Sequence, residues 1–273
     1  MLRGLIAALA ALIALAIAAS PAGAITFGQP DGSRHPEVGA LLADYDPDSP
    51  GPDLLCSGTL IAPTVFLTAS HCTAFLESQD IAADDVWVTF APSYDDDSTS
   101  TAGLIGGTYH TNPLYASGGA SNTYDIAAVV LDSSPGVTPA TLPHVGVLSQ
   151  LKASGAIYGT TFTAVGYGTV REIKTTGPNA FFFDGIRRYV LQSFLSLQKA
   201  WLTLDMNPST GSGGTCYGDS GGPHFLGGVN SDRIVSVTVT GDAVCRATDK
   251  TYRIDTSWAR DFLEQFPGVS YPD

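Results

Sequence analysis

The segment around Ser220 carries the residue types that a nucleophilic serine requires. It reads CYGDSGGP over residues 216–223. A serine hydroxyl is a poor nucleophile until a base takes its proton and hydrogen-bond donors stabilise the oxyanion that its attack creates. Small residues on both sides of Ser220 let a substrate carbonyl come close to the backbone, and the amides of Gly218 and Ser220 can converge on one oxygen. We therefore predict acyl-transfer chemistry at Ser220.

Two further regions contain the other residue types that such chemistry uses. One reads CSGTLI over residues 56–61 and LTASHC over residues 67–72, and it contains His71. The other reads YDIAAVVL over residues 124–131 and contains Asp125. A histidine suits proton transfer because its unperturbed pKa is about 6.5, close to neutral pH.

These segments resemble the nucleophile loop, the histidine block and the aspartate strand of the trypsin/chymotrypsin family of serine endopeptidases. The order His71, Asp125, Ser220 is that of the family, and it differs from the orders in subtilisin-like and α/β-hydrolase enzymes. The resemblance covers nearly the whole mature chain, with Ser70 where alanine is more common. It implies that Ser220 attacks a peptide carbonyl, His71 takes and returns the proton, and Asp125 orients His71. The amides of Gly218 and Ser220 would hold the oxyanion. The remaining histidines receive no functional role: His35, His110, His144 and His224.

Residues 1–24 have the composition of a secretory signal peptide. Arg3 supplies a positive charge, residues 5–19 form an apolar run, and AGA at 22–24 fits a cleavage site. A retained membrane anchor is the alternative, but the run is short for a spanning helix and polar residues follow it. We expect a mature protease domain at 25–273, secreted to an extracellular or periplasmic space and without membrane contact after cleavage.

Composition narrows the range of partners. The chain has 13 Lys and Arg against 26 Asp and Glu, giving a net charge of -13. No basic patch exists to hold nucleic acid, so that partner is not expected. A hydrophobic fraction of 44% is ample for a sizeable core. We expect a monomer that acts on protein or peptide substrates.

Four cysteines follow the signal segment, which suits an oxidising compartment. They allow three pairings, and the resemblance selects Cys56–Cys72 and Cys216–Cys245. A metal site is the alternative, but no Cys-x-x-Cys or His-x-x-His spacing supports it. We expect no metal and no other cofactor. The acidic loop at 94–101 lies where some relatives bind calcium, and a solvated loop without an ion is the preferred interpretation.

The mature chain has an all-β pattern. Short runs of Val, Ile, Thr and aromatic residues recur between turn residues, for example at 85–90, 162–168 and 233–239. This pattern alone does not separate a sandwich from barrels. The resemblance implies two six-stranded antiparallel β-barrels, about 25–140 and about 141–273, with the catalytic cleft between the barrels.

The end of the chain has a helical pattern. Trp258, Phe262 and Phe266 recur at four-residue spacing, and Asp255 or Thr256 can cap the first turn. The resemblance implies a C-terminal helix that packs against the second barrel. The crossover between barrels is expected near residues 133–150, which contain Pro, Gly and Ser.

Ile25 would become the new N-terminus if the signal peptide is cleaved after Ala24. In relatives, the freed ammonium inserts beside the aspartate that precedes the nucleophile, which is Asp219 here. An unpaired buried carboxylate is strongly unfavourable, so such a partner would be needed. We therefore expect an activation pair between Ile25 and Asp219, with no propeptide. A chance cleavage position is the alternative.

The expected specificity pocket departs from trypsin-like members. Gly214 occupies the position where those members carry an acidic residue, so Arg or Lys specificity is not expected. By the resemblance, Ser236 and Thr238 match a substrate-binding segment, and Thr238 would narrow the pocket beside Thr215. Ser236 could also support Asp125, or be an ordinary strand serine. We predict a shallow pocket for small or modest apolar side chains. An acidic preference is the alternative if Lys250 reaches the pocket base.

Two other classes of function compete with a secreted serine endopeptidase. A catalytically silent homologue could bind peptides or cell surfaces, and the altered segment at 237–238 favours it because substrate pairing could be hindered. Retention of all three triad residues opposes it. A hydrolase of esters or lipids would need an apolar acyl groove, which the sequence does not suggest.

Overall fold

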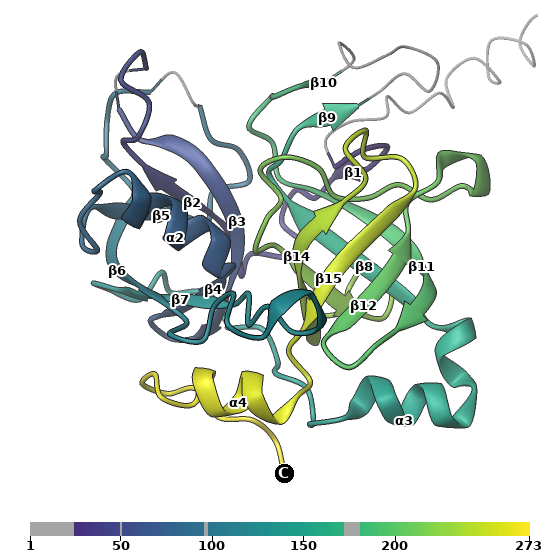
Figure 1. Ribbon diagram of the computed structural model, residues 1–273. Coiled ribbons are helices and arrows are strands. Elements are labelled where there is room, and N and C mark those ends of the chain that lie inside the picture. The colour runs from purple at the N-terminus through teal and green to yellow at the C-terminus, as the bar shows by residue number, and fades with distance from the viewer. Residues whose placement is uncertain (1–24, 50, 96–97, 172–180) are drawn as a thin grey trace, which may run out of the picture.

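The computed structural model describes residues 25–49, 51–95, 98–171 and 181–273. Two closed antiparallel barrels of six strands each form most of this part of the chain (Figure 1). This arrangement, with a helix near the C-terminus, confirms the predicted fold class. The expected signal peptide at 1–24 and residues 96–97 of the acidic loop lie outside the described residues.

The first barrel closes in the strand order β2-β3-β4-β7-β6-β5, with β5 returning to β2. Closure leaves no unpaired strand edge, which protects a sheet from association with other chains. Every residue of β2 is buried, and all of them are Val, Leu, Ala or Gly. The strands of this barrel are β2 (Val38–Ala43), β3 (Asp53–Ala62), β4 (Val65–Thr68), β5 (Val86–Thr89), β6 (Ile105–Thr111) and β7 (Ala127–Leu131).

The second barrel repeats this connectivity in the order β8-β11-β12-β15-β14-β13, with β11 and β13 both paired to β8. A short ribbon of β9 (Val170–Arg171) and β10 (Phe181–Phe182) lies outside it. The strands of this barrel are β8 (Thr161–Gly166), β11 (Arg188–Leu197), β12 (Trp201–Asp205), β13 (Pro223–Leu226), β14 (Ile234–Gly241) and β15 (Thr248–Arg253).

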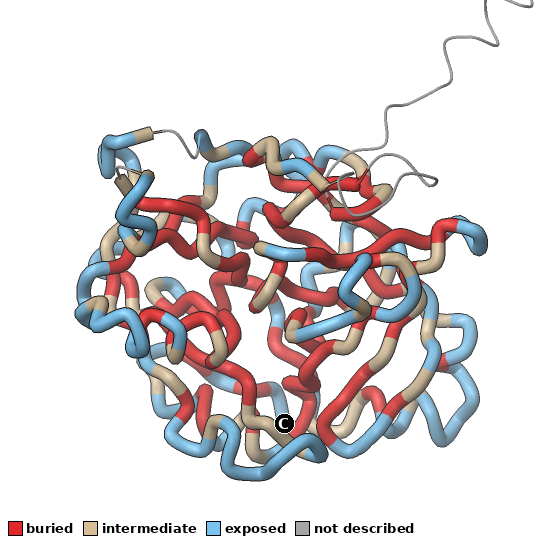
Figure 2. The backbone as a smooth tube through the Cα atoms, turned by 45° about the horizontal axis from the view of Figure 1, so that its top comes forward, coloured by how far each residue is buried: buried red, intermediate tan, exposed pale blue. Residues whose placement is uncertain are grey.

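The hydrophobic core follows the two barrels. Figure 2 shows buried backbone running through the barrel strands and exposed residues concentrated in the connecting loops. One cluster of buried residues fills the first barrel around Leu41, Leu60 and Phe66. A larger cluster includes residues of both barrels and of the C-terminal helix, among them Leu67 and Phe225. The barrels therefore share apolar contacts, which hold them in a fixed relative position.

Three α-helices accompany the barrels in the described residues: α2 (Ser70–Ser78), α3 (Val147–Ser154) and α4 (Ser257–Leu263). Thr256 caps α4 by accepting a hydrogen bond from the amide of Ala259. The sequence analysis did not anticipate α3, which lies in the connection between β7 and β8. Gly146 and Gly155 bound α3 with φ angles of 84° and 80°, a conformation that glycine adopts without strain. No helix among the described residues is long and apolar enough to cross a membrane.

The N-terminal strand β1 (Gln29–Pro30) pairs with β11 of the second barrel. The expected division assigns residues from about 25 onward to the first barrel, and β1 is an exception to it. A buried network explains its position. The carboxylate of Asp31 accepts a hydrogen bond from Nε of Arg187 at 3.0 Å, and Nη1 of Arg187 donates to the carbonyls of Val38 and Phe90 in the first barrel. Arg187, which directly precedes β11 of the second barrel, thus forms hydrogen bonds with both the N-terminal segment and the first barrel.

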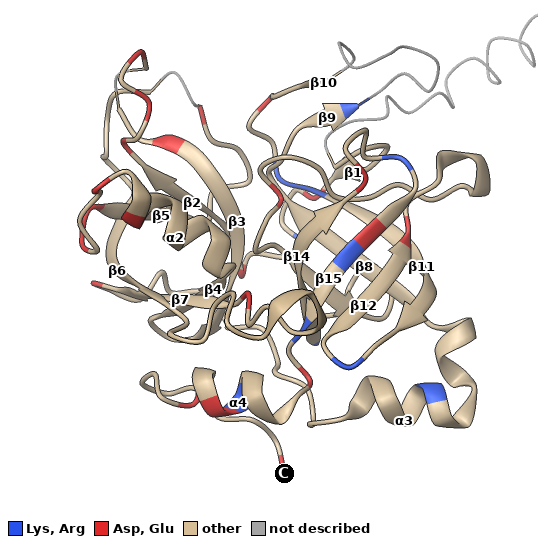
Figure 3. Cartoon of the chain, in the orientation of Figure 1, with Lys and Arg blue, Asp and Glu red and all other residues tan. Residues whose placement is uncertain are grey.

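Charge divides unevenly between the two halves of the chain. Residues 35–151 contain 14 Asp and Glu and no Lys or Arg, whereas residues 152–273 contain 11 of each kind. In Figure 3 the first barrel accordingly carries acidic segments alone, and basic segments lie on the second barrel and its helices.

Candidate active site

His71 and Asp125 come from neighbouring elements of the first barrel. His71 is the second residue of α2, directly after β4, and Asp125 lies two residues before β7, which pairs with β4. The His71 amide donates to Oδ1 of Asp125 at 2.9 Å, and Nδ1 of His71 lies 3.0 Å from Oδ2. When Nδ1 carries the proton for this bond, Nε2 has an unprotonated lone pair. The Asp125 side chain is 4% exposed and that of His71 is 29% exposed, so only the histidine reaches solvent.

Ser70 supports this arrangement from the residue before His71. Its hydroxyl donates to the carbonyl of Ile126 at 2.7 Å and accepts the amide of Asn112 at 3.1 Å. Both bonds are buried. The serine therefore anchors the start of α2 to the segment that carries Asp125, which gives a physical reason for a hydroxyl at this position.

Ser220 lies on the second barrel, in the loop before β13, and it is partly exposed. The peptides of this loop have well-defined partners. The carbonyl of Tyr217 accepts the amide of Thr169 at 2.7 Å, and the carbonyl of Asp219 accepts the amide of Gly222 at 2.8 Å. In a trans peptide the N–H points opposite to the carbonyl. The amides of Gly218 and Ser220 consequently point away from these partners.

The amides of Gly218 and Ser220 differ from most amides of this loop, and among the described residues the amide of Tyr217 likewise has no protein acceptor. The amides of Cys216, Asp219, Gly221 and Gly222 all donate to protein acceptors. In the described part of the chain, no protein acceptor binds the amide of Gly218 or that of Ser220. Gly218 has φ +92°, which glycine adopts without strain. Two neighbouring amides in this state are the donors that a developing oxyanion requires.

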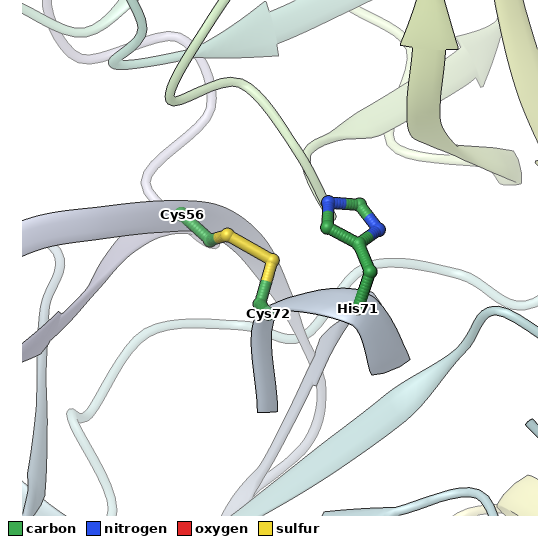
Figure 4. Close-up of side chains that lie close together, drawn as sticks. All are labelled: Cys56, His71 and Cys72. Atoms are coloured by element: carbon green, nitrogen blue, oxygen red, sulfur yellow. A yellow bond between two sulfur atoms is a disulfide. The ribbon is translucent and has the colours of Figure 1, made fainter. Parts of the chain in front are cut away.

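Both predicted disulfides are present. Cys56 bonds Cys72 beside His71, and Cys216 bonds Cys245 beside the nucleophile loop. Figure 4 shows the first disulfide next to the imidazole of His71. Cys56, His71 and Cys72 are the only cluster of potential metal ligands found among the described residues. Because both sulfurs form the disulfide, neither is a thiolate that could hold a metal.

Asp219 is fully buried, and its carboxylate binds backbone amides. Oδ1 accepts from Gly168 and Oδ2 accepts from Cys216, each at 2.8 Å. Burial raises the pKa of Asp219 to about 7, and these two hydrogen bonds oppose the increase. The carboxylate would therefore gain from a cationic partner.

The segment that begins at Ile25 lies against the second barrel. Ile25 is buried and contacts Ala164 and Val190 in the second barrel. Thr26 and Gly214 exchange backbone hydrogen bonds of 2.8 Å and 3.1 Å. A Cβ on Gly214 would lie 2.5 Å from Cβ of Met206, so any side chain there would collide with the core. Gly214 directly precedes Thr215, but it is not among the residues that line the cavity beside Ser220.

A cavity of about 290 Å³ opens beside Ser220. The predicted residues Thr215 and Thr238 both line it, and Asp242 adds one acidic side chain. The amides of Arg246, Ala247 and Thr248 bind the Asp242 carboxylate. Burial alone would raise the pKa of Asp242, but these bonds outweigh it and lower the pKa. A larger cavity, of about 700 Å³, is lined by residues of α3, α4 and the C-terminus, and none of the triad residues lines it.

Ser236 and Lys250 do not line the cavity beside Ser220. Ser236 is fully buried, is not among the residues that line the cavity, and accepts a hydrogen bond from Thr251 at 2.8 Å. Nζ of Lys250 lies 4.2 Å from the ring centroid of Trp201, a cation–π contact on β12. These contacts give no support to a Ser236–Asp125 bond or to a lysine at the pocket base.

Sequence reasoning missed a buried polar cluster beneath the cavity. Oδ2 of Asp249 accepts the Thr215 amide at 3.2 Å and Nε2 of Gln192 at 2.9 Å, and it lies 3.1 Å from Nε2 of His224. Burial would raise the pKa of Asp249, but His224 and these donors outweigh it, so the pKa is lowered. The resemblance gives His224 no catalytic role, and its partner Asp249 lies on another strand, 25 residues further along the chain.

Ser57 is a second residue whose contacts the sequence did not reveal. It lies on β3 and is fully buried. Its amide donates to the carbonyl of Ser220 at 2.9 Å, and its hydroxyl donates to the carbonyl of Gly218 at 3.0 Å. A residue of the first barrel therefore forms two hydrogen bonds with the nucleophile loop of the second barrel.

A comparison with known families agrees with this geometry. The family model named Trypsin matches residues 44–260, a span that includes strands of both barrels. The chain belongs to the trypsin family, whose members have a serine protease fold and act on proteins. No curated protein matches the sequence closely enough to count as a relative.

Proposed function

We propose that the chain is a secreted serine endopeptidase that hydrolyses peptide bonds through His71, Asp125 and Ser220. The observation that carries this proposal is the pair of contacts between Asp125 and His71, because they orient the imidazole and fix its tautomer. Family membership supports the reaction class. Two disulfides support an oxidising, extracellular or periplasmic location.

The proposed reaction is acyl transfer through a covalent intermediate. Nε2 of His71 takes the proton of the Ser220 hydroxyl as its oxygen attacks the scissile carbonyl, and the amides of Gly218 and Ser220 bind the oxyanion. The imidazolium returns the proton to the leaving amine when the carbon–nitrogen bond breaks. Water then attacks the acyl-enzyme with His71 again as the base, which releases the acid product and free Ser220.

Activation is proposed to follow from cleavage before Ile25. The new ammonium would pair with Asp219, whose buried carboxylate has backbone donors and a raised pKa. The Thr26–Gly214 pairing supports this, because it holds the same segment to the residue directly before Thr215.

One added residue before Ile25 should lower kcat/KM by about a hundredfold or more, because the ammonium would be displaced and the buried carboxylate left unpaired. Peptide hydrolysis by the extended and the Ile25-initiated proteins measures this effect. The matched control adds the same residue after Asp273, and we expect it to leave activity unchanged. Equal activity in all three proteins would rule out the activation pair.

For specificity we propose a preference for small or modest apolar side chains, without Arg or Lys specificity. The support is the modest cavity beside Ser220, which is lined partly by Thr215, Thr238 and Val239. Asp242 is the one side chain in that lining that could favour a cation, and three backbone amides already use its carboxylate.

The test of the function is digestion of a diverse peptide library by the mature protein, with Ser220→Ala as the control. Cleavage that is absent from the control would support the endopeptidase, and the residue before each cut reports the pocket preference. Ester turnover without peptide turnover would instead indicate an esterase. A wild type as inactive as the control would indicate a silent homologue that binds peptides.

A further inference from the structure

Ser57 donates hydrogen bonds to two carbonyls of the nucleophile loop, one on each side of the Asp219–Ser220 peptide. Its hydroxyl donates to the carbonyl of Gly218, and its amide donates to the carbonyl of Ser220. The peptide between Asp219 and Ser220 lies between these two carbonyls. That peptide carries the Ser220 amide, one of the two donors available to an oxyanion.

The Ser57 hydroxyl is itself fixed in direction. Its oxygen accepts the amide of Tyr167 at 3.0 Å, so one acceptor position and the single donor are both used. Neighbouring glycines leave little room around it. A Cβ on Gly166 would lie 3.1 Å from Oγ of Ser57, and a Cβ on Gly222 would lie 3.2 Å from its Cβ. The hydroxyl therefore has one preferred orientation in a close-packed site.

The other contacts of the Gly218–Asp219 peptide show what the Ser57 hydroxyl contributes to its orientation. The amide of Asp219 already donates to the carbonyl of Cys216 at 3.0 Å, which fixes one end of the peptide between Gly218 and Asp219. The Ser57 hydroxyl fixes the other end of that peptide, at the Gly218 carbonyl. Without it, the partly buried Gly218 carbonyl would lack this donor, and rotation of the peptide toward another donor would relieve the cost. Such a rotation would turn the adjoining Gly218 and Ser220 amides away from a common point.

We propose that Ser57 is a positioning residue for the oxyanion hole, acting from the first barrel through its hydroxyl. The inference rests on the proposed peptidase function and adds a residue to that site. Ser57 does not touch the substrate. It sets the direction of the amides that do, so its loss should weaken binding of the transition state more than binding of the substrate.

Thr59 offers a matched control. It lies on the same strand two residues later, so its side chain shares the face of β3 on which Ser57 lies. It is also fully buried, and within the described part of the chain its hydroxyl has no hydrogen-bond partner. Thr59→Val removes a buried hydroxyl without removing a hydrogen bond.

The experiment compares wild type, Ser57→Ala and Thr59→Val as mature proteins, with active sites titrated by a fluorophosphonate so that only competent molecules are counted. For Ser57→Ala we expect kcat to fall about tenfold, the effect of one lost hydrogen bond, with KM changed less than about twofold. A peptide boronic acid, which Ser220 converts to a tetrahedral adduct, should bind about tenfold more weakly. Thr59→Val should match wild type in all three measurements.

The outcomes distinguish failure of the proposed Ser57 role from failure of the proposed peptidase function. An active wild type with equal kcat and boronate affinity in Ser57→Ala would overturn the role of Ser57 alone. A fall in kcat without a fall in boronate affinity, or an equal effect of Thr59→Val, would also overturn it, because the loss would then reflect general packing. A wild type that neither hydrolyses peptides nor reacts with the fluorophosphonate would overturn the peptidase function and the Ser57 role together.

Discussion

The two barrels have the same strand connectivity but place their charges differently. In the first barrel, most acidic side chains of the described residues are exposed, and Asp125 is one of the few that are buried. The second barrel and its connections bury Arg187, Arg253, Asp219 and Asp249, most of them in ion pairs or polar clusters. In the proposed mechanism the first barrel supplies the proton-transfer pair, whereas the second barrel uses buried charge to fix its loops.

This difference shows what each half contributes to one site. Proton transfer needs a histidine that solvent and substrate can reach, and His71 is partly exposed. Oxyanion binding needs amides that do not move during the reaction, and a buried polar network provides that rigidity. The predictions below test each side of the comparison.

The largest expected effect concerns His71. His71→Ala should lower kcat by about 10⁴-fold or more, because Ser220 would lose its base. Its free energy of unfolding should change by less than about 1 kcal/mol, since the side chain is partly exposed. Steady-state kinetics and urea unfolding measure the two quantities. A large loss of stability would mean that the first barrel also depends on this residue for its fold.

The next effect concerns the buried charges at the second barrel. Arg187→Met should lower the free energy of unfolding by about 3 to 5 kcal/mol, because Asp31 would remain buried without its guanidinium partner. The comparison is Asp84→Asn on the exposed surface of the first barrel, for which we expect less than about 0.5 kcal/mol. Similar losses in the free energy of unfolding for both variants, measured with urea, would show that buried charge does not stabilise the second barrel more than exposed charge stabilises the first barrel.

The third effect concerns pH and Asp219. In a chain still extended before Ile25, the pKa of this buried carboxyl is raised to about 7. The folded state then holds a proton that the unfolded state has released, so stability falls as pH rises from about 4 to about 7. The loss attributable to Asp219 should reach up to about 4 kcal/mol.

Denaturant unfolding of the Ser220→Ala protein at pH 5 and pH 7.5 measures this slope without self-digestion. The slope should be smaller in the protein that begins at Ile25, where the ammonium can pair with the carboxylate. Asp219→Asn should remove it from the extended protein. An unchanged slope in Asp219→Asn would assign the pH dependence to other groups.

The smallest expected effect concerns the uneven charge. The acidic first barrel should attract cationic peptides at long range, and salt should screen this attraction. Raising the ionic strength from about 0.02 M to about 0.5 M should lower kcat/KM severalfold for a Lys-flanked peptide and raise it or leave it unchanged for a Glu-flanked peptide. Equal salt dependence for both peptides would show that the charge of the first barrel does not guide substrates.

The parts of this protein that the sequence predicted are those encoded by local motifs. The segments around His71, Asp125 and Ser220 are short, and the family resemblance was sufficient to predict both barrels and both disulfides. Residue type and position limited the cap of α4 to Asp255 or Thr256, and the structure shows Thr256.

The missed features depend on contacts between distant strands. Ser57 meets Gly218 across 161 residues, and Asp249 meets Gln192 across 57. No periodicity marks such pairs, because each residue has an ordinary place in its own strand. The pairing of β1 with β11 was missed for the same reason, since the buried Asp31–Arg187 contact that accompanies it joins residues 156 positions apart.

The most direct test of the central claim is covalent labelling of the mature protein by a fluorophosphonate, followed by intact-mass measurement and peptide mapping. A serine activated by His71 should displace fluoride and gain one phosphonyl group, on Ser220 and not in Ser220→Ala, and His71→Ala should react far more slowly. An unmodified wild type, or equal labelling of wild type and His71→Ala, would contradict the account.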